Sequence, residues 1–388
     1  MTEYIHRSAE KTILEIARVF PVVTLTGPRQ SGKTTLARRL FADKPYVSLE
    51  SPDAFDLAAN DARQFFAQFP NGAVIDEAQR VPEIFSWLQT ITDESQEMGQ
   101  FVVTGSQNYA LTAKITQSLA GRAGMVRLLP FAQDELRGVV PEADLDERLF
   151  AGGYPPIYSR GAEPAMWLGN YVQTYIERDV HQLLNVRDLS TFRRFLALCA
   201  GRCGQLVNLS SLAADAGITR NTAAEWLSVL EAGFIVFQLR PYFNNYRKRL
   251  VKSSKLYFYD TGLLCSLLGI REPGHLTAHP LRGAIFESYV ISEIAKKYEN
   301  AGQTPPLWFW RDSNGHEVDL LIQNGPTATP VEIKSGRTFV SEFFNTVKKW
   351  NALAGTQGGA VACGGDRTFD FQGSKLVSWR DLSALGAP

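Results

Sequence analysis

The stretch GPRQSGKT at residues 27–34 constrains the fold of this chain more than any other part of its sequence. It fits the pattern G-x-x-x-x-G-K-[ST], in which glycines allow a tight loop that ends in a lysine and a hydroxyl. The apolar run VVTLT precedes the stretch and the helical pattern TTLARRLF follows it. A strand, a glycine-rich loop and a helix in this order surround a phosphate group with backbone N–H donors. A plain surface turn is the competing interpretation, and both flanks argue against it.

The loop predicts a site for the polyphosphate of ATP or ADP. Lys33 is expected to bridge the β- and γ-phosphates, and Thr34 to hold Mg²⁺. The expected nucleotide-binding residues in this loop are Gly27, Pro28, Arg29, Gln30, Ser31, Gly32, Lys33, Thr34 and Thr35.

Two later strands end in polar residues that belong to the same chemistry. The run AVIDEAQ brings Asp76 and Glu77 to the carboxyl end of an apolar strand, where ligands of α/β sheets bind. Asp76 is expected to hold Mg²⁺ and Glu77 to orient or activate the attacking water. The run FVVTGSQN ends a further strand in small polar residues, so Ser106, Gln107 or Asn108 is expected to lie between the metal and the γ-phosphate, and Gln107 is counted with the nucleotide-binding residues. An acidic helix cap and a plain turn are the alternatives.

The stretch LAGRAG places Arg122 on a turn flanked by glycines. An arginine there could neutralise charge in the transition state of phosphoryl transfer, either in its own site or in the site of a neighbouring subunit. The second role predicts a homo-oligomer. A solvated surface arginine is the alternative.

The chain of 388 residues alternates short apolar runs with helical patterns over residues 21–140, which predicts a parallel, three-layer α/β unit. A helical pattern follows, and after residue 271 a third unit mixes helices and strands. We therefore expect three domains, at residues 1–145, 146–270 and 271–388.

Composition indicates the cellular compartment but identifies no binding partner. Lys+Arg and Asp+Glu number 40 each, so net charge predicts no nucleic-acid or membrane partner. The four cysteines suggest buried thiols rather than a disulfide framework, since they show neither paired metal-ligand spacing nor a regular pattern. No apolar run is long enough to span a bilayer, and no secretory signal is recognisable. We expect a cytoplasmic protein without a membrane partner.

Residues 208–237, NLSSLAADAGITRNTAAEWLSVLEAGFIVF, have the pattern of a winged helix-turn-helix. A first helix ends at Gly217, a turn follows, and a second helix ends at Gly233. Such a second helix can enter the major groove of DNA, and the basic segment that follows suits a wing that contacts phosphates. The expected DNA-contacting residues are Arg220, Arg247, Lys248, Arg249, Lys252 and Lys255. A protein-packing module with a solvated basic loop is the alternative.

Carboxylates near the C-terminal end follow the order found in nucleases. Glu287 lies on a predicted helix, Asp319 on the strand HEVDLLI, and Glu332 with Lys334 on one face of the strand VEIKS. The three carboxylates suit Mg²⁺ or Mn²⁺, and the lysine suits metal-assisted hydrolysis of a phosphodiester. Two edge strands with charged rims could give the same letters. Whether such a site still cuts is a separate question.

The chain as a whole resembles a family of bacterial and archaeal AAA+-type ATPases with a C-terminal region of unknown function. The matching motifs are GPRQSGKTT, AVIDEAQ, TGSQN, LAGRAG, YIERDV, KLYFYDTGLL and EVDLLI…VEIKSG. The resemblance implies a P-loop AAA+ core, a helical and winged-helix middle, and a PD-(D/E)xK restriction-endonuclease-like α/β domain. The motif's usual Pro-Asp opening is absent, because Val318 precedes Asp319.

These observations predict an ATP-hydrolysing protein that binds and processes DNA, with Mg²⁺ at the phosphate loop and a second Mg²⁺ or Mn²⁺ at the C-terminal site. The alternative is a nucleotide-dependent regulatory or scaffold ATPase whose C-terminal domain binds DNA or protein without cutting.

Overall fold

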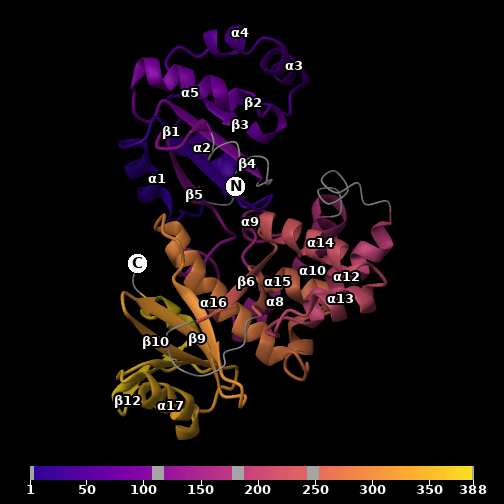
Figure 1. Cartoon of the computed structure of the whole chain (residues 1–388), viewed down its shortest axis with the longest axis vertical. Coiled ribbons are helices and arrows are strands. Elements are labelled where there is room, and N and C mark those ends of the chain that lie inside the picture. The colour runs from indigo at the N-terminus through magenta and orange to yellow at the C-terminus, as the bar shows by residue number, and fades with distance from the viewer. Residues whose placement is uncertain (1–3, 107–117, 177–187, 243–252, 387–388) are drawn as a thin grey trace.

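The computed structural model describes residues 4–106, 118–176, 188–242 and 253–386 (Figure 1). Its N-terminal unit contains a five-stranded parallel sheet in the order β2-β3-β4-β1-β5. The strands are β1 (Val22–Gly27), β2 (Tyr46–Ser48), β3 (Val74–Asp76), β4 (Phe101–Ser106) and β5 (Ala123–Arg127). Every residue of β1 is buried, as is usual for a parallel strand that is covered on both faces.

Helices cover both faces of this sheet. They are α1 (Glu10–Ala17), α2 (Lys33–Leu40), α3 (Pro52–Asn60), α4 (Ala62–Ala67) and α5 (Ile84–Ser95). Val22 packs in a core with α3, α4 and α5, whereas its neighbour Val23 packs in a second core with α1 and α2. Successive strand residues point to opposite faces, so the two cores confirm the predicted three-layer α/β unit.

The middle of the chain is helical, with a hairpin near its end. Its helices are α7 (Gln133–Leu136), α8 (Leu145–Ala151), α9 (Pro155–Ser159), α10 (Pro164–Tyr171), α12 (Leu189–Gly201), α13 (Leu209–Ala216), α14 (Arg220–Ala232) and α15 (Thr261–Leu267). Helix α13 ends at left-handed Gly217, and the Thr219 hydroxyl caps α14 by accepting from the Thr222 amide at 3.1 Å. The strands β6 (Val236–Pro241) and β7 (Lys255–Phe258) then pair antiparallel. The predicted pair of helices is present, and an antiparallel hairpin follows it.

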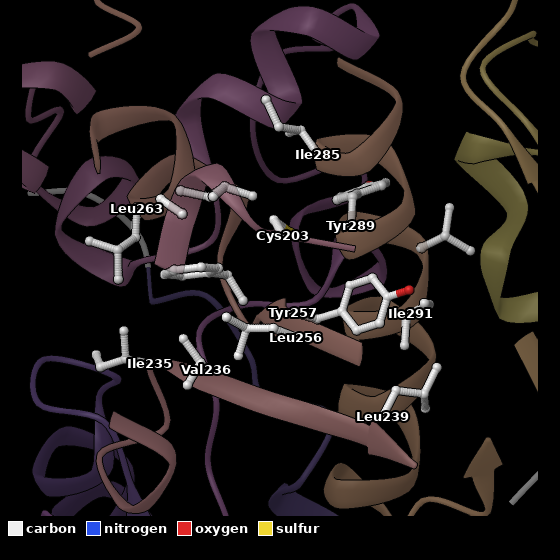
Figure 2. Packing of buried hydrophobic residues seen from close by; sticks show 14 of the residues in the cluster. Cys203, Ile235, Val236, Leu239, Leu256, Tyr257, Leu263, Ile285, Tyr289 and Ile291 are labelled. Atoms are coloured by element: carbon white, nitrogen blue, oxygen red, sulfur yellow. The ribbon is translucent and has the colours of Figure 1, made fainter. Parts of the chain in front are cut away.

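That hairpin belongs to the C-terminal sheet. The eight strands run in the order β12-β13-β11-β10-β9-β8-β6-β7, and β6 pairs parallel with β8. The added strands are β8 (Leu307–Arg311), β9 (Glu317–Asn324), β10 (Thr327–Lys334), β11 (Ala360–Cys363), β12 (Phe369–Phe371) and β13 (Ser374–Ser378). One apolar core extends from Leu145 to Leu385, and Figure 2 shows side chains of β6, β7, α15 and α16 meeting within it. The expected boundary at residue 271 therefore does not separate two cores.

Helix α16 (Arg282–Asn300) is the longest described helix and joins the two halves of the molecule. Figure 1 shows it extending from the C-terminal sheet toward the N-terminal unit. Its Glu299 pairs with Arg127 of β5 at 2.9 Å, and its Lys296 donates to the carbonyl of Phe131 at 3.0 Å. Helix α17 (Asn345–Ala354) covers β9 and β10 on the C-terminal side.

The described residues include no helix that is both long enough and apolar enough to cross a membrane. The four cysteines are buried free thiols, as predicted.

Asp260 provides a direct test of how the middle of the chain is held. Its buried carboxylate accepts from the amides of Leu263 at 2.8 Å and Gly153 at 2.7 Å, so it caps α15 and fixes the start of α9. We expect Asp260→Ala to lower the free energy of unfolding by about 2–4 kcal/mol, because two buried donors lose a charged acceptor. Denaturation with urea, followed by tryptophan fluorescence, measures this loss.

Asp188 is the matched control, because it caps α12 from an exposed position by accepting from the amides of Ser190 and Thr191. Asp188→Ala should lower the free energy of unfolding by much less than Asp260→Ala does. Equal losses in the two variants would contradict the role of burial at Asp260.

Candidate functional site

The phosphate loop connects β1 to α2, and its backbone requires glycine at two points. A Cβ atom on Gly27 would lie 2.2 Å from the carbonyl oxygen of Leu128, and Gly32 has a φ of 92°. Because α2 begins at Lys33, the positive end of its helix dipole lies at the phosphate loop. The loop therefore has the geometry that the sequence predicted for phosphate binding.

Two side chains of the loop are arranged for an anionic ligand. Lys33 is buried, and its Nζ donates to the carbonyl oxygens of Gly27 at 3.0 Å and Pro28 at 2.7 Å. The Ser31 hydroxyl is buried and has no hydrogen-bond partner among the described residues. Phosphate oxygens would accept from both groups, so the loop fits a nucleotide polyphosphate.

Asp76 lies at the carboxyl end of β3, next to the loop, where it was expected. Thr34 Oγ1 donates to Asp76 Oδ2 at 3.0 Å, and the Tyr46 hydroxyl donates to the same oxygen at 2.9 Å. The Thr104 hydroxyl of β4 donates to the other oxygen. A hydroxyl beside a carboxylate is an oxygen donor set that suits Mg²⁺. Thr34 and Asp76 would hold that ion, and Tyr46 and Thr104 orient the carboxylate.

Glu77 follows Asp76 in a left-handed conformation with a φ of 55°, which is unusual for a residue other than glycine. Burial raises the pKa of its carboxyl, while Arg29 and Lys33 act in the opposite direction. Gln79 Nε2 donates to Glu77 and also to Ser106 Oγ at the end of β4. Glu77 is therefore held beside the loop, as a residue that positions water would be. The predicted Gln107 lies outside the described residues.

Arg7 supports the phosphate loop, although it belongs to no motif that would have identified it from the sequence. Its buried guanidinium donates to the carbonyl oxygen of Ser31 at 2.7 Å and to that of Leu129 at 2.6 Å. It also pairs with the buried carboxylate of Glu135 at 3.1 Å and lies over the ring of Phe131. Arg7 thus links the loop to the segment that follows β5.

Arg122 does not lie where a role in its own nucleotide site would need it. Its carbonyl accepts from the amide of Val22 at the amino end of β1, whereas the phosphate loop follows the carboxyl end. The two ends are about 17 Å apart along the strand. The side chain instead pairs with Asp93 of α5 at 2.9 Å. The own-site interpretation of Arg122 is therefore wrong in this conformation, and a role in a neighbouring subunit stays a prediction.

The three predicted carboxylates lie on elements that contact each other, Glu287 on α16, Asp319 on β9 and Glu332 on β10. The backbone pairing of β9 with β10 ends at Leu320 and Val331, and beyond it Asp319 Oδ2 accepts from the amide of Ile333 at 2.9 Å. Glu332 Oε1 pairs with Lys334 Nζ at 2.6 Å.

The charges of these side chains act on each other. Burial and the charge of Asp319 raise the pKa of Glu332. Burial opposes the charge of Lys334, but the neighbouring carboxylates, which are Glu332, Asp319 and Glu287, outweigh it and raise the pKa of this lysine. Residues from one helix and two strands therefore act on each other at short range.

The predicted position of Lys255 is wrong. It was expected on an exposed DNA-binding wing, but β7 buries it inside the carboxylate site. Its Nζ pairs with Glu287 at 3.0 Å and with Glu317 at 2.5 Å. Burial opposes the charge of Lys255, but Glu287 and Glu317 outweigh it and raise its pKa. Tyr257, two residues along β7, donates to Glu287 as well.

The fit of this site to a second metal ion is mixed. Glu332 Oε2 is buried and has no hydrogen-bond partner among the described residues, so it could accept a cation. However, no three His, Cys, Asp or Glu side chains in the described part of the chain are grouped to hold a metal. Lys255 occupies the space between Glu287 and Glu317 instead. The predicted ion with three carboxylate ligands is not formed in this arrangement.

Of the other five residues predicted to contact DNA, the structure describes only Arg220. Arg220 lies exposed in the first turn of α14, where a recognition helix would meet DNA. The other four basic residues predicted to contact DNA lie outside the described residues. They are Arg247, Lys248, Arg249 and Lys252.

Comparison with known proteins divides the chain into three matched segments. Residues 19–137 match the family described as AAA domain. Residues 142–274 and 282–382 match two families described as domains of unknown function, DUF8612 and DUF4143. The N-terminal unit is therefore an ATPase-like AAA domain, and this match supports ATP binding at its phosphate loop.

Two uncharacterized proteins are similar over most of the chain. They are Rv2008c of Mycobacterium tuberculosis and Mb2031c of Mycobacterium bovis, each 33% identical over 322 residues, or 82% of this chain and 71% of the relative.

Three solved structures show weaker likeness. The Walker-type ATPase PABY2304 of Pyrococcus abyssi has a TM-score of 0.46 and 15% identity over 67% of this chain and 94% of its own. A single-residue variant of RuvB from Thermotoga maritima has a TM-score of 0.32 and 20% identity, with 59% and 87% covered. AMPPCP-bound DnaA from Aquifex aeolicus has a TM-score of 0.28 and 12% identity, with 57% and 85% covered. Scores this low do not establish a shared fold.

The contacts of Arg7 predict that it supports nucleotide binding without touching the nucleotide itself. Arg7→Ala removes a buried charged donor from the Ser31 carbonyl, so we expect ATP affinity to fall about 10-fold. Titration with a fluorescent ATP analogue measures the affinity.

Arg39→Ala is the control, because Arg39 also lies over an aromatic ring, that of Tyr4, but is exposed on α2. The prediction fails if both variants bind the analogue as tightly as the unmodified protein.

The raised pKa of Glu332 has a consequence for stability. Burial and the charge of Asp319 raise this pKa to about 7, above the ordinary value of 4.5. Between these two pH values the folded protein binds the proton more tightly than the unfolded chain does, so the contribution of Glu332 to stability falls as pH rises. Glu332→Gln removes that dependence, and the variant should become progressively more stable relative to the unmodified protein from about pH 5 to about pH 7.5.

Urea denaturation at several pH values measures this difference in the free energy of unfolding. Glu342→Gln, at an exposed glutamate in the same domain, should show no such trend. A constant difference between the Glu332→Gln variant and the unmodified protein would contradict the raised pKa.

Proposed function

This chain belongs to the family of the mycobacterial proteins Rv2008c and Mb2031c, and from that premise we propose that it is an ATP-hydrolysing protein that binds and processes DNA. The AAA domain would bind and hydrolyse ATP, and the C-terminal site would act on a phosphodiester. The observation that supports this best is that one helix, α16, connects the two sites. Its Glu299, near the carboxyl end, pairs with the AAA domain, and its Glu287, nearer the amino end, belongs to the carboxylate site.

In the ATPase half, each residue has a separate task. The loop amides, Lys33 and the Ser31 hydroxyl would bind the phosphates. Thr34 and Asp76 would hold Mg²⁺, which neutralises charge on the phosphates when bound. Glu77 would orient the attacking water, because its conformation keeps its carboxylate beside the loop. Arg122 would act only across an interface with a neighbouring subunit, which makes a homo-oligomer part of the proposal.

In the C-terminal half, Asp319 and Glu332 would hold Mg²⁺ or Mn²⁺. Glu287 would become a third ligand once its ion pair with Lys255 is broken. Lys334 would stabilise negative charge on the phosphate. Arg220 on α14 and the basic segment at 247–252 would bind the DNA backbone, in the manner of a winged helix. The nearest support is the shared site of Asp319, Glu332 and Lys334, which has the order of a restriction-endonuclease-like motif.

A second candidate function is supported by Lys255. A lysine between Glu287 and Glu317 provides the positive charge that a metal would otherwise supply. The C-terminal domain would then bind DNA or protein without cutting, and the chain would be a nucleotide-dependent scaffold or regulatory ATPase.

ATP hydrolysis and DNA cleavage test the proposal together. With Mg²⁺, the protein should hydrolyse ATP, and Lys33→Ala or Glu77→Gln should lower kcat by about 100-fold or more. With Mg²⁺ or Mn²⁺, it should cleave duplex, single-stranded or branched DNA, and Asp319→Ala should abolish cleavage. Lys11→Ala and Asp370→Ala, at exposed positions of the two domains, are the controls and should retain activity.

The outcomes separate the two candidate functions. DNA binding at low salt without cleavage under any metal condition would favour the scaffold. Absence of DNA affinity at low salt would refute the DNA part of the proposal, and ATP hydrolysis unaffected by Lys33→Ala would refute the ATPase part.

A further inference from the structure

The Gln79 amide connects Glu77 to the strand that lies beside the phosphate loop. Its Nε2 donates to Glu77 Oε2 and, at 3.0 Å, to Ser106 Oγ. Among the described residues, no other side chain hydrogen-bonds with the Glu77 carboxylate. The position of the residue that would orient the attacking water therefore depends on one neutral side chain.

Both ends of this bridge are fixed by the fold. Gln79 lies in the short 3-10 helix Ala78–Arg80, and Ala78 is buried in the core that α3, α4 and α5 form on one face of the sheet. Ser106 is the last residue of β4, and it pairs in register with Gly27 of β1, the first residue of the phosphate loop. Gln79 therefore fixes Glu77 relative to the start of the loop.

The left-handed backbone at Glu77 adds to this dependence on Gln79. The residue has a φ of 55° and a ψ of 41°, which a residue with a Cβ atom adopts at a cost in free energy. Residues strained in this way cluster at active sites, where the surrounding structure holds them in place. Here the contact with Gln79 is what directs the carboxylate after the backbone has turned.

Gln79 also keeps a buried polar atom without a partner. Its carbonyl oxygen Oε1 has no hydrogen-bond partner among the described residues. A side chain present only for packing could be apolar, like the buried Ala78 and Val81 on either side of it, and would avoid this cost. The donor that Gln79 offers to Glu77 therefore explains this amide better than packing does.

We propose that Gln79 is a positioning residue for ATP hydrolysis. It holds Glu77 Oε2, which leaves Oε1 to accept from the attacking water. This rests on the proposed function, in which Glu77 orients that water. Without the amide, the carboxylate would sample several positions, and few of them would place the water for attack on the γ-phosphate.

Gln79→Met tests this role, because it keeps the length of the side chain but removes the donor. With Mg²⁺ and saturating ATP, we expect kcat to fall about 10- to 100-fold, since misplacing a reacting group by about 1 Å has an effect of this size. Affinity for a fluorescent ATP analogue should stay unchanged, which also shows that the variant is folded. Ser106→Ala, which removes one end of the bridge and keeps the contact with Glu77, should cause a smaller loss of kcat.

A comparison in a second background separates positioning from a general effect on the fold. In a Glu77→Gln protein, Gln79→Met should cause no further loss of kcat, because both changes remove the same contribution. Hydrolysis of radiolabelled ATP is sensitive enough to follow these slow variants. Gln64→Met, at an exposed glutamine on α4 of the same domain, is the control and should keep the kcat of the unmodified protein.

Three results would overturn the role of Gln79. They are an unchanged or raised kcat in the Gln79→Met variant, a fall in its nucleotide affinity as large as the fall in kcat, and a full further loss in the Glu77→Gln background. Each of them leaves ATP hydrolysis by the unmodified protein standing. If the unmodified protein binds the analogue but hydrolyses no ATP, the ATPase part of the proposed function fails, and the role of Gln79 fails with it.

Discussion

Helix α16 is the element on which the arrangement of the two candidate sites depends. Glu287 lies near its amino end in the carboxylate site, and Glu299 near its carboxyl end pairs with Arg127 of the AAA domain. The two glutamates are about 18 Å apart along a helix that rises about 1.5 Å per residue. Between them, Lys296 and Glu293 bind the Phe131 carbonyl and the Gln133 amide. Since a helix is rigid over this length, the contacts with the AAA domain and the position of Glu287 are linked.

Arg7 connects the AAA-domain segment that α16 contacts to the phosphate loop. Its guanidinium binds the carbonyl oxygens of Ser31 in the loop and of Leu129 in the segment after β5. Lys296 of α16 binds the same segment two residues later, at Phe131. A contiguous set of buried, charge-assisted hydrogen bonds therefore joins the loop to α16. Such bonds tolerate little change in length. Movement of the loop on nucleotide binding would therefore be transmitted to α16.

Sequence reasoning succeeded where chemistry is local in the chain and failed where it depends on pairing between distant segments. The loop at residues 27–34 and the order of its flanking elements follow from neighbouring residues, and the structure confirms them. The sequence suggested that Lys255 was one more basic residue of a wing. Its burial could not be predicted, because it depends on β6 pairing with the distant strand β8. Arg7 belongs to no motif, so its role could be read only from its contacts with the loop and with the segment after β5. Arg122 has the flanking glycines of a mobile turn, but strand direction places it at the wrong edge of the sheet.

Charge balance in the carboxylate site explains why the pKa of Glu332 is raised. Glu317 is balanced by Arg311 at 3.2 Å, which leaves Glu287, Asp319 and Glu332 against Lys255 and Lys334. Three carboxylates and two lysines have one excess negative charge in a buried environment, where an uncompensated charge is costly. A proton on Glu332 removes that excess, and burial together with the charge of Asp319 is the physical reason that its pKa rises to about 7. A divalent cation would compensate the same charge, so the ion proposed for this site would compete with a proton for Glu332.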